Sequence, residues 1–194
     1  VASLQAVSFW GIGEPLLHPD IVEMVSLANG LGASTQLITN GLLLDARLAE
    51  GLIEAGLDSI VISIDGVSPE TYSDVRRGST LEAVQRNVER LRALRRRSGR
   101  QGPRIGIEFV AMRRNAGELK NLRSLAAAMG AVFIVVTNVL PHSDELKDEI
   151  LYRSSAGMWS PSARSEWDPE IRWPRMDWWR EDLPSVTGMR QGPQ

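Results

Sequence analysis

Three apolar runs in this sequence each end in polar side chains that could bind a ligand. Glu14 follows the first run, and Thr39 and Asn40 close the second. Ser63 and Asp65 close the third. Ligands of α/β folds sit at the carboxyl ends of the strands, where the active site of a barrel also lies. Each segment alone can be interpreted as an ordinary turn, but the three in succession favour one shared site.

The first of these segments reads Gly11-Ile12-Gly13-Glu14-Pro15. Its two glycines allow a tight turn and a close approach of the backbone to a ligand, and its proline stiffens the exit. The turn leaves Glu14 at the carboxyl end of a strand. The alternative is a plain strand-to-helix turn with a solvated glutamate, and this segment by itself does not separate the two interpretations.

The other candidates also allow two interpretations. Ser63 and Asp65 are two residues apart, so both side chains face the same side of a strand; a buried serine before an aspartate turn is the alternative. The Asn40-Gly41 pair is common in turns for conformational reasons alone. Arg76 or Arg77 could bind a carboxylate through two parallel hydrogen bonds, or the pair could be solvent-exposed.

Helix start signals fall between the apolar runs. Ser79 and Glu82 have the spacing of a capping box, and Asn115 and Glu118 imitate it. Ser68-Pro69 places a capping residue directly before a first-turn proline. A ligand contact from Asn115 is conceivable, but we interpret this residue as a helix cap.

The expected secondary structure alternates strands with amphipathic helices. This order predicts a parallel sheet with right-handed crossovers, and thus either part of a (β/α) barrel or an open doubly wound sheet. The expected strands are short, rich in β-branched or bulky residues and bounded by Gly, Asn or Asp. They are Ala6–Trp10, Thr35–Thr39, Ser59–Ile64, Ile105–Met112 and Val132–Thr137.

Composition restricts the classes of function. The chain has 194 residues, 43% hydrophobic and 24% charged, with a net charge of −2, as expected for one globular domain without nucleic acid or membrane partners. An arginine-rich stretch within residues 92–104 falls at a helix end and lacks interleaved aromatics, so we interpret it as a solvated face. No apolar run is long enough to cross a bilayer, which makes a cytoplasmic location the expectation. The chain has no cysteine and two histidines, so it predicts no thiolate or histidine-rich metal site.

The composition changes near residue 141. The preceding part, residues 1–141, carries the strand and helix pattern. Residues 141–194 hold six of the ten prolines and five of the six tryptophans, and a helix is expected only around Ser143–Tyr152. That much aromatic surface needs a partner. We expect residues 142–194 to be a linker that packs along the domain or against something that follows it.

Taken together, the sequence resembles the radical S-adenosylmethionine (SAM) superfamily, and more closely its branch with a cysteine-rich SPASM-type auxiliary domain. The motifs occur in the family's order and cover residues 1 to about 141. They are Trp10–Leu16, Ile38–Gly41, Ile62–Gly66, Val75–Gly78 and Phe109–Asn115 with Glu118-Leu119.

The resemblance implies a partial TIM-like (β/α) barrel of which about five of six βα units are present, the first strand being absent. In that family the barrel binds SAM beside a 4Fe–4S cluster. The complete protein would cleave SAM reductively to a 5′-deoxyadenosyl radical that abstracts hydrogen from a peptide, protein or small-molecule substrate. Peptide modification, or maturation of a cofactor or enzyme, is the expected role, with an electron donor such as ferredoxin or flavodoxin.

The resemblance also assigns roles to residues. Gly13, Glu14 and Pro15 match the loop that meets the amino group of SAM. Ser63 and Asp65 match positions near the ribose and the methionine moiety. An arginine of the family pairs with the SAM carboxylate; it matches Arg77 or Arg76, because the doubled arginine leaves the register open. The cofactor-binding set is Gly13, Glu14, Pro15, Thr39, Asn40, Ser63, Asp65 and Arg77, with no metal ligand and no assigned catalytic residue.

One departure from the family pattern is serious. The family's CxxxCxxC loop, which precedes GxGEP and holds the cluster, is missing, and no cysteine appears before Gln194. We therefore expect an inactive fragment that lacks this loop and the C-terminal auxiliary domain. The alternative is a degenerate or truncated homologue that acts as a non-catalytic SAM- or protein-binding module. An unrelated TIM-barrel or Rossmann-type enzyme is disfavoured, because the third glycine of the dinucleotide fingerprint is absent and Pro15 obstructs the helix start.

Overall fold

The computed structural model describes residues 4–76, 78–139, 146, 148–150, 152–154 and 165–167. Half of the expected helix around Ser143–Tyr152, namely 143–145, 147 and 151, lies outside these residues. The division of the chain near residue 141 therefore stays a prediction.

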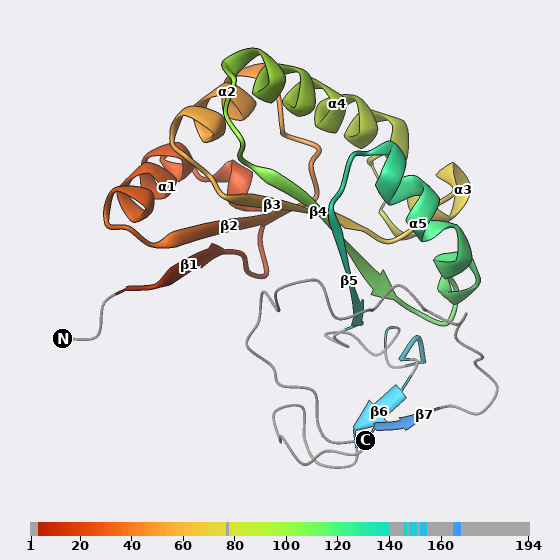
Figure 1. Cartoon of the computed structure of the whole chain (residues 1–194). Helices are drawn as coiled ribbons and strands as arrows, with labels where there is room; N and C mark the ends of the chain where they lie inside the picture. The colour runs from red at the N-terminus through yellow and green to blue at the C-terminus, as the bar shows by residue number, and fades with distance from the viewer. Residues whose placement is uncertain are drawn as a thin grey trace.

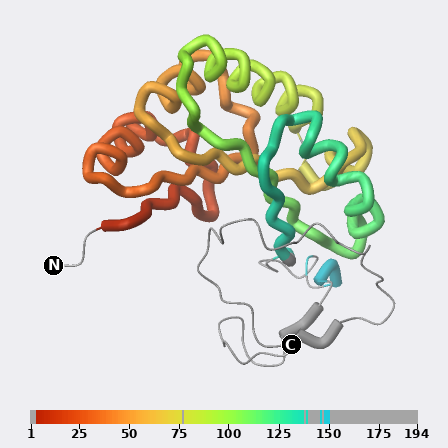
Figure 2. Tube along the Cα trace, viewed as in Figure 1, coloured from red at the N-terminus to blue at the C-terminus, as the bar shows by residue number. Residues whose placement is uncertain are grey.

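Five parallel strands form one sheet in chain order (Figure 1). This confirms the predicted parallel α/β architecture, with strand ends within one or two residues of the expected ones. The tube in Figure 2 shows consecutive strands side by side, as in part of a barrel wall. The strands are β1 (Ala6–Phe9), β2 (Ser34–Thr39), β3 (Ser59–Ile64), β4 (Arg104–Ala111) and β5 (Phe133–Asn138).

The α-helices of this unit lie over one face of the sheet (Figure 1). They are α1 (Ile21–Gly30), α2 (Ala46–Glu54), α3 (Pro69–Val75), α4 (Leu81–Ser98) and α5 (Leu119–Ala128). Two 3-10 turns, η1 (Pro15–Leu17) and η2 (Ala116–Glu118), follow β1 and β4, and β6 (Tyr152–Ser154) pairs antiparallel with β7 (Ser165–Trp167). Within the part of the chain that the structure describes, no helix has the length and apolar character needed to cross a membrane.

The hydrophobic core lies between the sheet and the helices. Ile60, Ile62 and Ile64 of β3 are fully buried and belong to the core cluster with residues of α2 and α4. Because side chains alternate along a strand, the residues between these isoleucines face the other side of the sheet. We call that side the inner face. It carries Ser63 of β3 and Glu108 of β4, which are paired in the strand register.

The predicted helix caps are partly right. Ser68 caps α3 as predicted, because its Oγ accepts a hydrogen bond from the Thr71 backbone N–H at 3.3 Å. The prediction for α4 is one residue early. Thr80 is the N-cap and accepts from the Ala83 N–H, while the hydroxyl of Ser79 lies 3.3 Å from that of Tyr72. Ser79 therefore joins the loop to α3 and does not cap α4.

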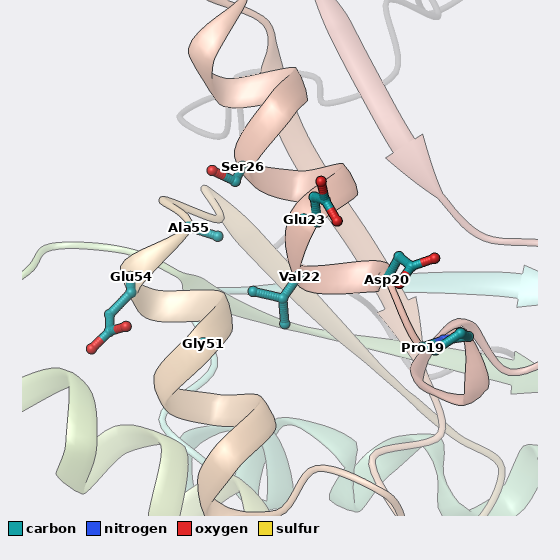
Figure 3. Close-up of a pocket in the computed structure, with 8 residues that line it drawn as sticks. All are labelled: Pro19, Asp20, Val22, Glu23, Ser26, Gly51, Glu54 and Ala55. Atoms are coloured by element: carbon teal, nitrogen blue, oxygen red, sulfur yellow. The ribbon is translucent and has the colours of Figure 1, made fainter.

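A pocket of about 490 Å³ lies between α1 and α2 (Figure 3). It is lined by Pro19, Asp20, Val22 and Glu23 on one side and by residues of α2 on the other. These residues belong to the helical layer and to the turn before it. The pocket includes none of the residues that the sequence predicts for ligand binding.

Candidate functional site

Glu14 joins the carboxyl ends of β1 and β2. Its Oε1 accepts hydrogen bonds from the Thr39 hydroxyl at 2.6 Å and from the Leu16 N–H at 3.0 Å. Its Oε2 accepts from the Asn40 N–H at 2.9 Å. Glu14 also caps η1, which Pro15 starts. The carboxylate is therefore fixed in place by groups from both strand ends and not left solvated.

Thr39 and Asn40 shape the turn after β2. The Thr39 side chain is almost completely buried, and its hydroxyl also accepts from the Gly41 N–H at 3.0 Å. The Asn40 Oδ1 accepts from the Leu42 N–H at 2.8 Å, an Asx turn. Thr39 thus holds Glu14 and the turn, so any effect of Thr39 on a ligand is indirect.

Asn87 of α4 is a supporting residue that the sequence analysis missed. Its Nδ2 donates to the carbonyls of Gly41 and Leu42 at 3.0 and 2.9 Å. Gly41 has a left-handed φ of 75°, which glycine adopts without strain. A signal was present in the sequence, because Asn87 is a polar residue between Val84 and Leu91 on the apolar stripe of its helix.

Ser63, Asp65 and Arg76 form the second half of the site, after β3. Arg76 Nε donates to Asp65 Oδ2 at 2.6 Å, and Arg76 Nη2 donates to Ser63 Oγ at 2.8 Å. Asp65 is 7% exposed, and its second oxygen, Oδ1, is buried without a hydrogen-bond partner among the described residues. The sequence left open which arginine belongs here. The structure places Arg76 in this cluster, whereas Arg77 lies outside the described residues.

The two halves lie at the same rim of the sheet. Thr39 pairs with Ile62 in the parallel register of β2 and β3, so the next residues, Asn40 and Ser63, end neighbouring strands. Gly13, in the loop after β1, has no atom within 4 Å of the place where a Cβ would lie, which leaves open space beside the rim. That Glu14, Asn40, Ser63 and Asp65 face one cavity stays a prediction.

Asn115 stands at the N-cap position of η2, but its side chain does not cap the helix as we interpreted from the sequence. Its side chain makes no cap hydrogen bond and is fully buried. Nδ2 donates to the carbonyls of Asp65 and Val110 at 2.8 and 2.9 Å, and Oδ1 accepts from the Met112 N–H at 2.7 Å. Asn115 therefore fixes the end of β3 against the end of β4. Its amide is fully used by the protein, which argues against a direct ligand contact.

Glu118 supports the same region from η2. Its carboxylate accepts hydrogen bonds from the backbone N–H groups of Val67 and Ser68. Burial acts to raise the pKa of Glu118, but hydrogen bonds from Ser68, Val67 and Thr71 lower it overall. The carboxylate is therefore the form that holds the start of α3 beside the strand ends.

Glu108 is a further charged residue that the sequence analysis missed. It lies on the inner face of β4, directly paired with Ser63. Burial, and after it the charge of Asp65, raise the pKa of the Glu108 carboxyl, against the lowering effects of a Thr137 hydrogen bond and of Arg76. Its signal in the sequence is one carboxylate within the apolar strand Arg104–Ala111.

Gly66 lets α3 approach the end of β3. A Cβ at this position would lie 2.3 Å from the Tyr72 backbone nitrogen and 2.7 Å from the Thr71 carbonyl carbon. Tyr72 is fully buried, and its carbonyl accepts from the Arg76 N–H at 2.8 Å. A side chain at Gly66 would therefore push α3 away and displace Arg76.

We expect Gly66→Ala to lower the free energy of unfolding by about 3 kcal/mol, because overpacking against backbone cannot be relieved by a rotamer change. Urea denaturation followed by circular dichroism measures this. Gly117→Ala is the matched control, since nothing lies within 4 Å of a Cβ there; we expect a change within about 0.5 kcal/mol. Equal stability of the two variants would contradict the packing argument.

Metal ligands are not gathered within the part of the chain that the structure describes: no three His, Cys, Asp or Glu side chains there are placed to hold an ion. The site thus offers carboxylates, an arginine, a serine hydroxyl and open backbone. Such groups suit a zwitterionic organic ligand with hydroxyl groups.

Comparison with known proteins gives a family. The model of the radical SAM superfamily matches residues 5–122. A tungsten-containing aldehyde ferredoxin oxidoreductase cofactor-modifying protein of Pyrococcus furiosus is 32% identical over 156 residues, 80% of this chain and 44% of that protein. A PqqA peptide cyclase of Gluconobacter oxydans is 28% identical over 193 residues, 90% of this chain and 52% of that protein. The chain thus spans about half the length of these relatives.

Solved structures agree on the fold. Streptococcus suis SuiB bound to S-adenosylmethionine superposes with a TM-score of 0.60 at 18% identity, over 73% of this chain and 31% of that one. At this identity the likeness concerns the fold alone. It matches the partial barrel expected from the sequence.

Proposed function

The chain belongs to the radical SAM superfamily, and we propose that the carboxyl rim of its sheet binds SAM. The observation that carries the proposal is the buried Oδ1 of Asp65 beside Arg76 and Ser63, which has no hydrogen-bond partner within the part of the chain that the structure describes. A buried carboxylate oxygen without a partner is costly, and a ligand that donates a hydrogen bond would remove that cost. SAM carries such donors in its ammonium group and its ribose hydroxyls, so the residues present fit this ligand.

Each half of the site has its own role in this proposal. Arg76, or its neighbour Arg77, binds the SAM carboxylate, and the position of Arg76 beside Asp65 favours Arg76. Ser63 and Asp65 accept hydrogen bonds from the ribose and the methionine part. The loop through Gly13 and Glu14, held by Pro15, receives the ammonium group, with Thr39 and Asn40 supporting it at the rim.

The iron–sulfur cluster of the family is a different matter. In a radical SAM enzyme, one-electron reduction of bound SAM by a 4Fe–4S cluster supplies a 5′-deoxyadenosyl radical that abstracts hydrogen from the substrate. This chain has no cysteine, so its own residues do not supply the thiolates that hold such a cluster. What these residues support is binding and orientation of SAM.

For the whole protein we propose a radical SAM enzyme of the SPASM-type branch that modifies a peptide or acts in cofactor or enzyme maturation, with ferredoxin or flavodoxin as electron donor. The names of the two relatives, one a cofactor-modifying protein and the other a peptide cyclase, support these two kinds of function. The absence of cysteine favours a second candidate, a non-catalytic module that binds SAM or a protein. Formation of 5′-deoxyadenosine under reducing conditions by the protein encoded in the extended reading frame would separate the two.

SAM binding to this chain can be tested directly by calorimetry. We expect SAM to bind and Asp65→Asn to weaken binding about tenfold, because an amide replaces a charged acceptor of hydrogen bonds from the ligand. Glu50→Gln, at an exposed position of α2, makes the same charge change far from the rim and should leave binding unchanged. Absence of SAM binding, or equal affinity of wild type and Asp65→Asn, would refute the proposed site.

A further inference from the structure

Glu108 is a charged residue on the inner face of the sheet. It is directly paired with Ser63 in the β3–β4 register and with Val135 in the β4–β5 register. The residues on either side of it, Ile107 and Phe109, point to the opposite, core face of the sheet and are fully buried there. Glu108 itself is only half-buried, and it faces the side of the sheet that carries Ser63.

The charges around Glu108 do not cancel. Asp65 and Glu108 are two carboxyl groups, and the charge of Arg76 acts to lower the pKa of Glu108. Arg76 is already used by Asp65 and Ser63, at 2.6 and 2.8 Å. Thr137, a neutral residue, also acts to lower the pKa of the Glu108 carboxyl. With both acids ionised, the three groups of Asp65, Glu108 and Arg76 have a net charge of −1, and the buried Asp65 Oδ1 has no hydrogen-bond partner among the described residues.

We propose that Glu108 makes this site prefer the positively charged sulfonium of SAM to the neutral thioether of S-adenosylhomocysteine. The ammonium and carboxylate groups of SAM cancel each other, so the sulfonium gives the molecule its net charge of about +1 at neutral pH. A cluster of charge −1 complements that net charge. S-adenosylhomocysteine keeps every other group of SAM and lacks only the methyl group and its charge.

This inference rests on the proposed SAM site and adds a residue to it. The competing explanation is that Glu108 only helps to hold Arg76. In that case its loss should weaken both ligands equally, because both carry the carboxylate that Arg76 binds. The ratio of the two affinities therefore separates charge selection from a positioning role.

The test is calorimetric titration of the chain and of Glu108→Gln with SAM and with S-adenosylhomocysteine. We expect Glu108→Gln to weaken SAM binding about tenfold, because a charge interaction in a partly buried site is lost. Binding of S-adenosylhomocysteine should weaken less than about twofold. Glu50→Gln should change neither affinity. Equal weakening of both ligands, or no change in either, overturns the role of Glu108 while leaving the SAM site standing. If the chain binds neither ligand, the proposed function fails and this inference falls with it.

Thermal unfolding gives a second readout. The folded structure raises the pKa of Glu108, so above that pKa the ionised carboxylate destabilises the fold. Glu108→Gln should therefore keep or raise the melting temperature at pH 8 while SAM affinity falls. A lower melting temperature together with equal loss of both ligands would assign Glu108 a structural role instead.

Discussion

Replacing Asn115 with leucine is expected to remove about 3 kcal/mol of the free energy of unfolding. The side chain is fully buried and makes three hydrogen bonds to backbone groups of Asp65, Val110 and Met112. Leucine has a similar volume but no polar group. It would leave two buried carbonyls and one buried N–H without partners, and each such group costs about 1–3 kcal/mol.

Urea denaturation measures this loss. Asn121→Leu, at an exposed position of α5, is the control, and its effect should stay within about 0.5 kcal/mol. If Asn115→Leu lowers the free energy of unfolding by less than about 1 kcal/mol, the ends of β3 and β4 are joined by other contacts. Because Asn115 holds the Asp65 carbonyl, loss of SAM affinity should accompany the loss of stability.

Arg76→Met is expected to destabilise the chain by about 2–3 kcal/mol, because it leaves the Asp65 carboxylate buried beside Glu108 without its cation. Arg76 is 23% exposed and the Asp65 side chain 9%, so the cost is below that of a fully buried pair. Asp65→Asn in the same chain removes the uncompensated charge. The double variant should therefore recover about half or more of the lost stability.

The double-mutant cycle of Arg76→Met and Asp65→Asn, followed by chemical denaturation, measures the coupling. Arg123→Met, exposed on α5, is the matched control and should change stability by less than about 0.5 kcal/mol. Additive effects of the two substitutions would show that this ion pair contributes nothing. The same Arg76→Met protein should also lose most of its affinity for SAM, since it lacks the group proposed to bind the carboxylate.

Local patterns in the sequence predicted the strands and their parallel order well. The nearly continuous apolar run Ile60–Ile64 predicts a buried strand from local residues alone. Ser68-Pro69 predicts the start of α3 through contacts within four residues. Ser79 and Thr80 are both good caps; in the structure Thr80 caps α4, and the Ser79 hydroxyl contacts that of Tyr72. Such a choice depends on the arrangement of neighbouring elements.

The parts of the site that were missed depend on distant contacts. Asn115 bonds to the Asp65 carbonyl, 50 residues away, and no local pattern distinguishes that bond from a cap. The choice between Arg76 and Arg77 depends on how α3 ends, at a residue with φ −110° and ψ 76°. The place of Glu108 in the site depends on the strand register, which pairs it with Ser63.

The most direct test of the SAM site is a titration of the ¹⁵N-labelled chain with SAM, followed by two-dimensional NMR. We predict shifts of the backbone amides at the carboxyl rim, namely Gly13, Glu14, Asn40, Ser63, Asp65 and Arg76. Amides of Val22 and Gly51, in the pocket between α1 and α2, should stay unchanged (Figure 3). Shifts confined to that pocket, or no shifts at the rim at saturating SAM, would contradict the account.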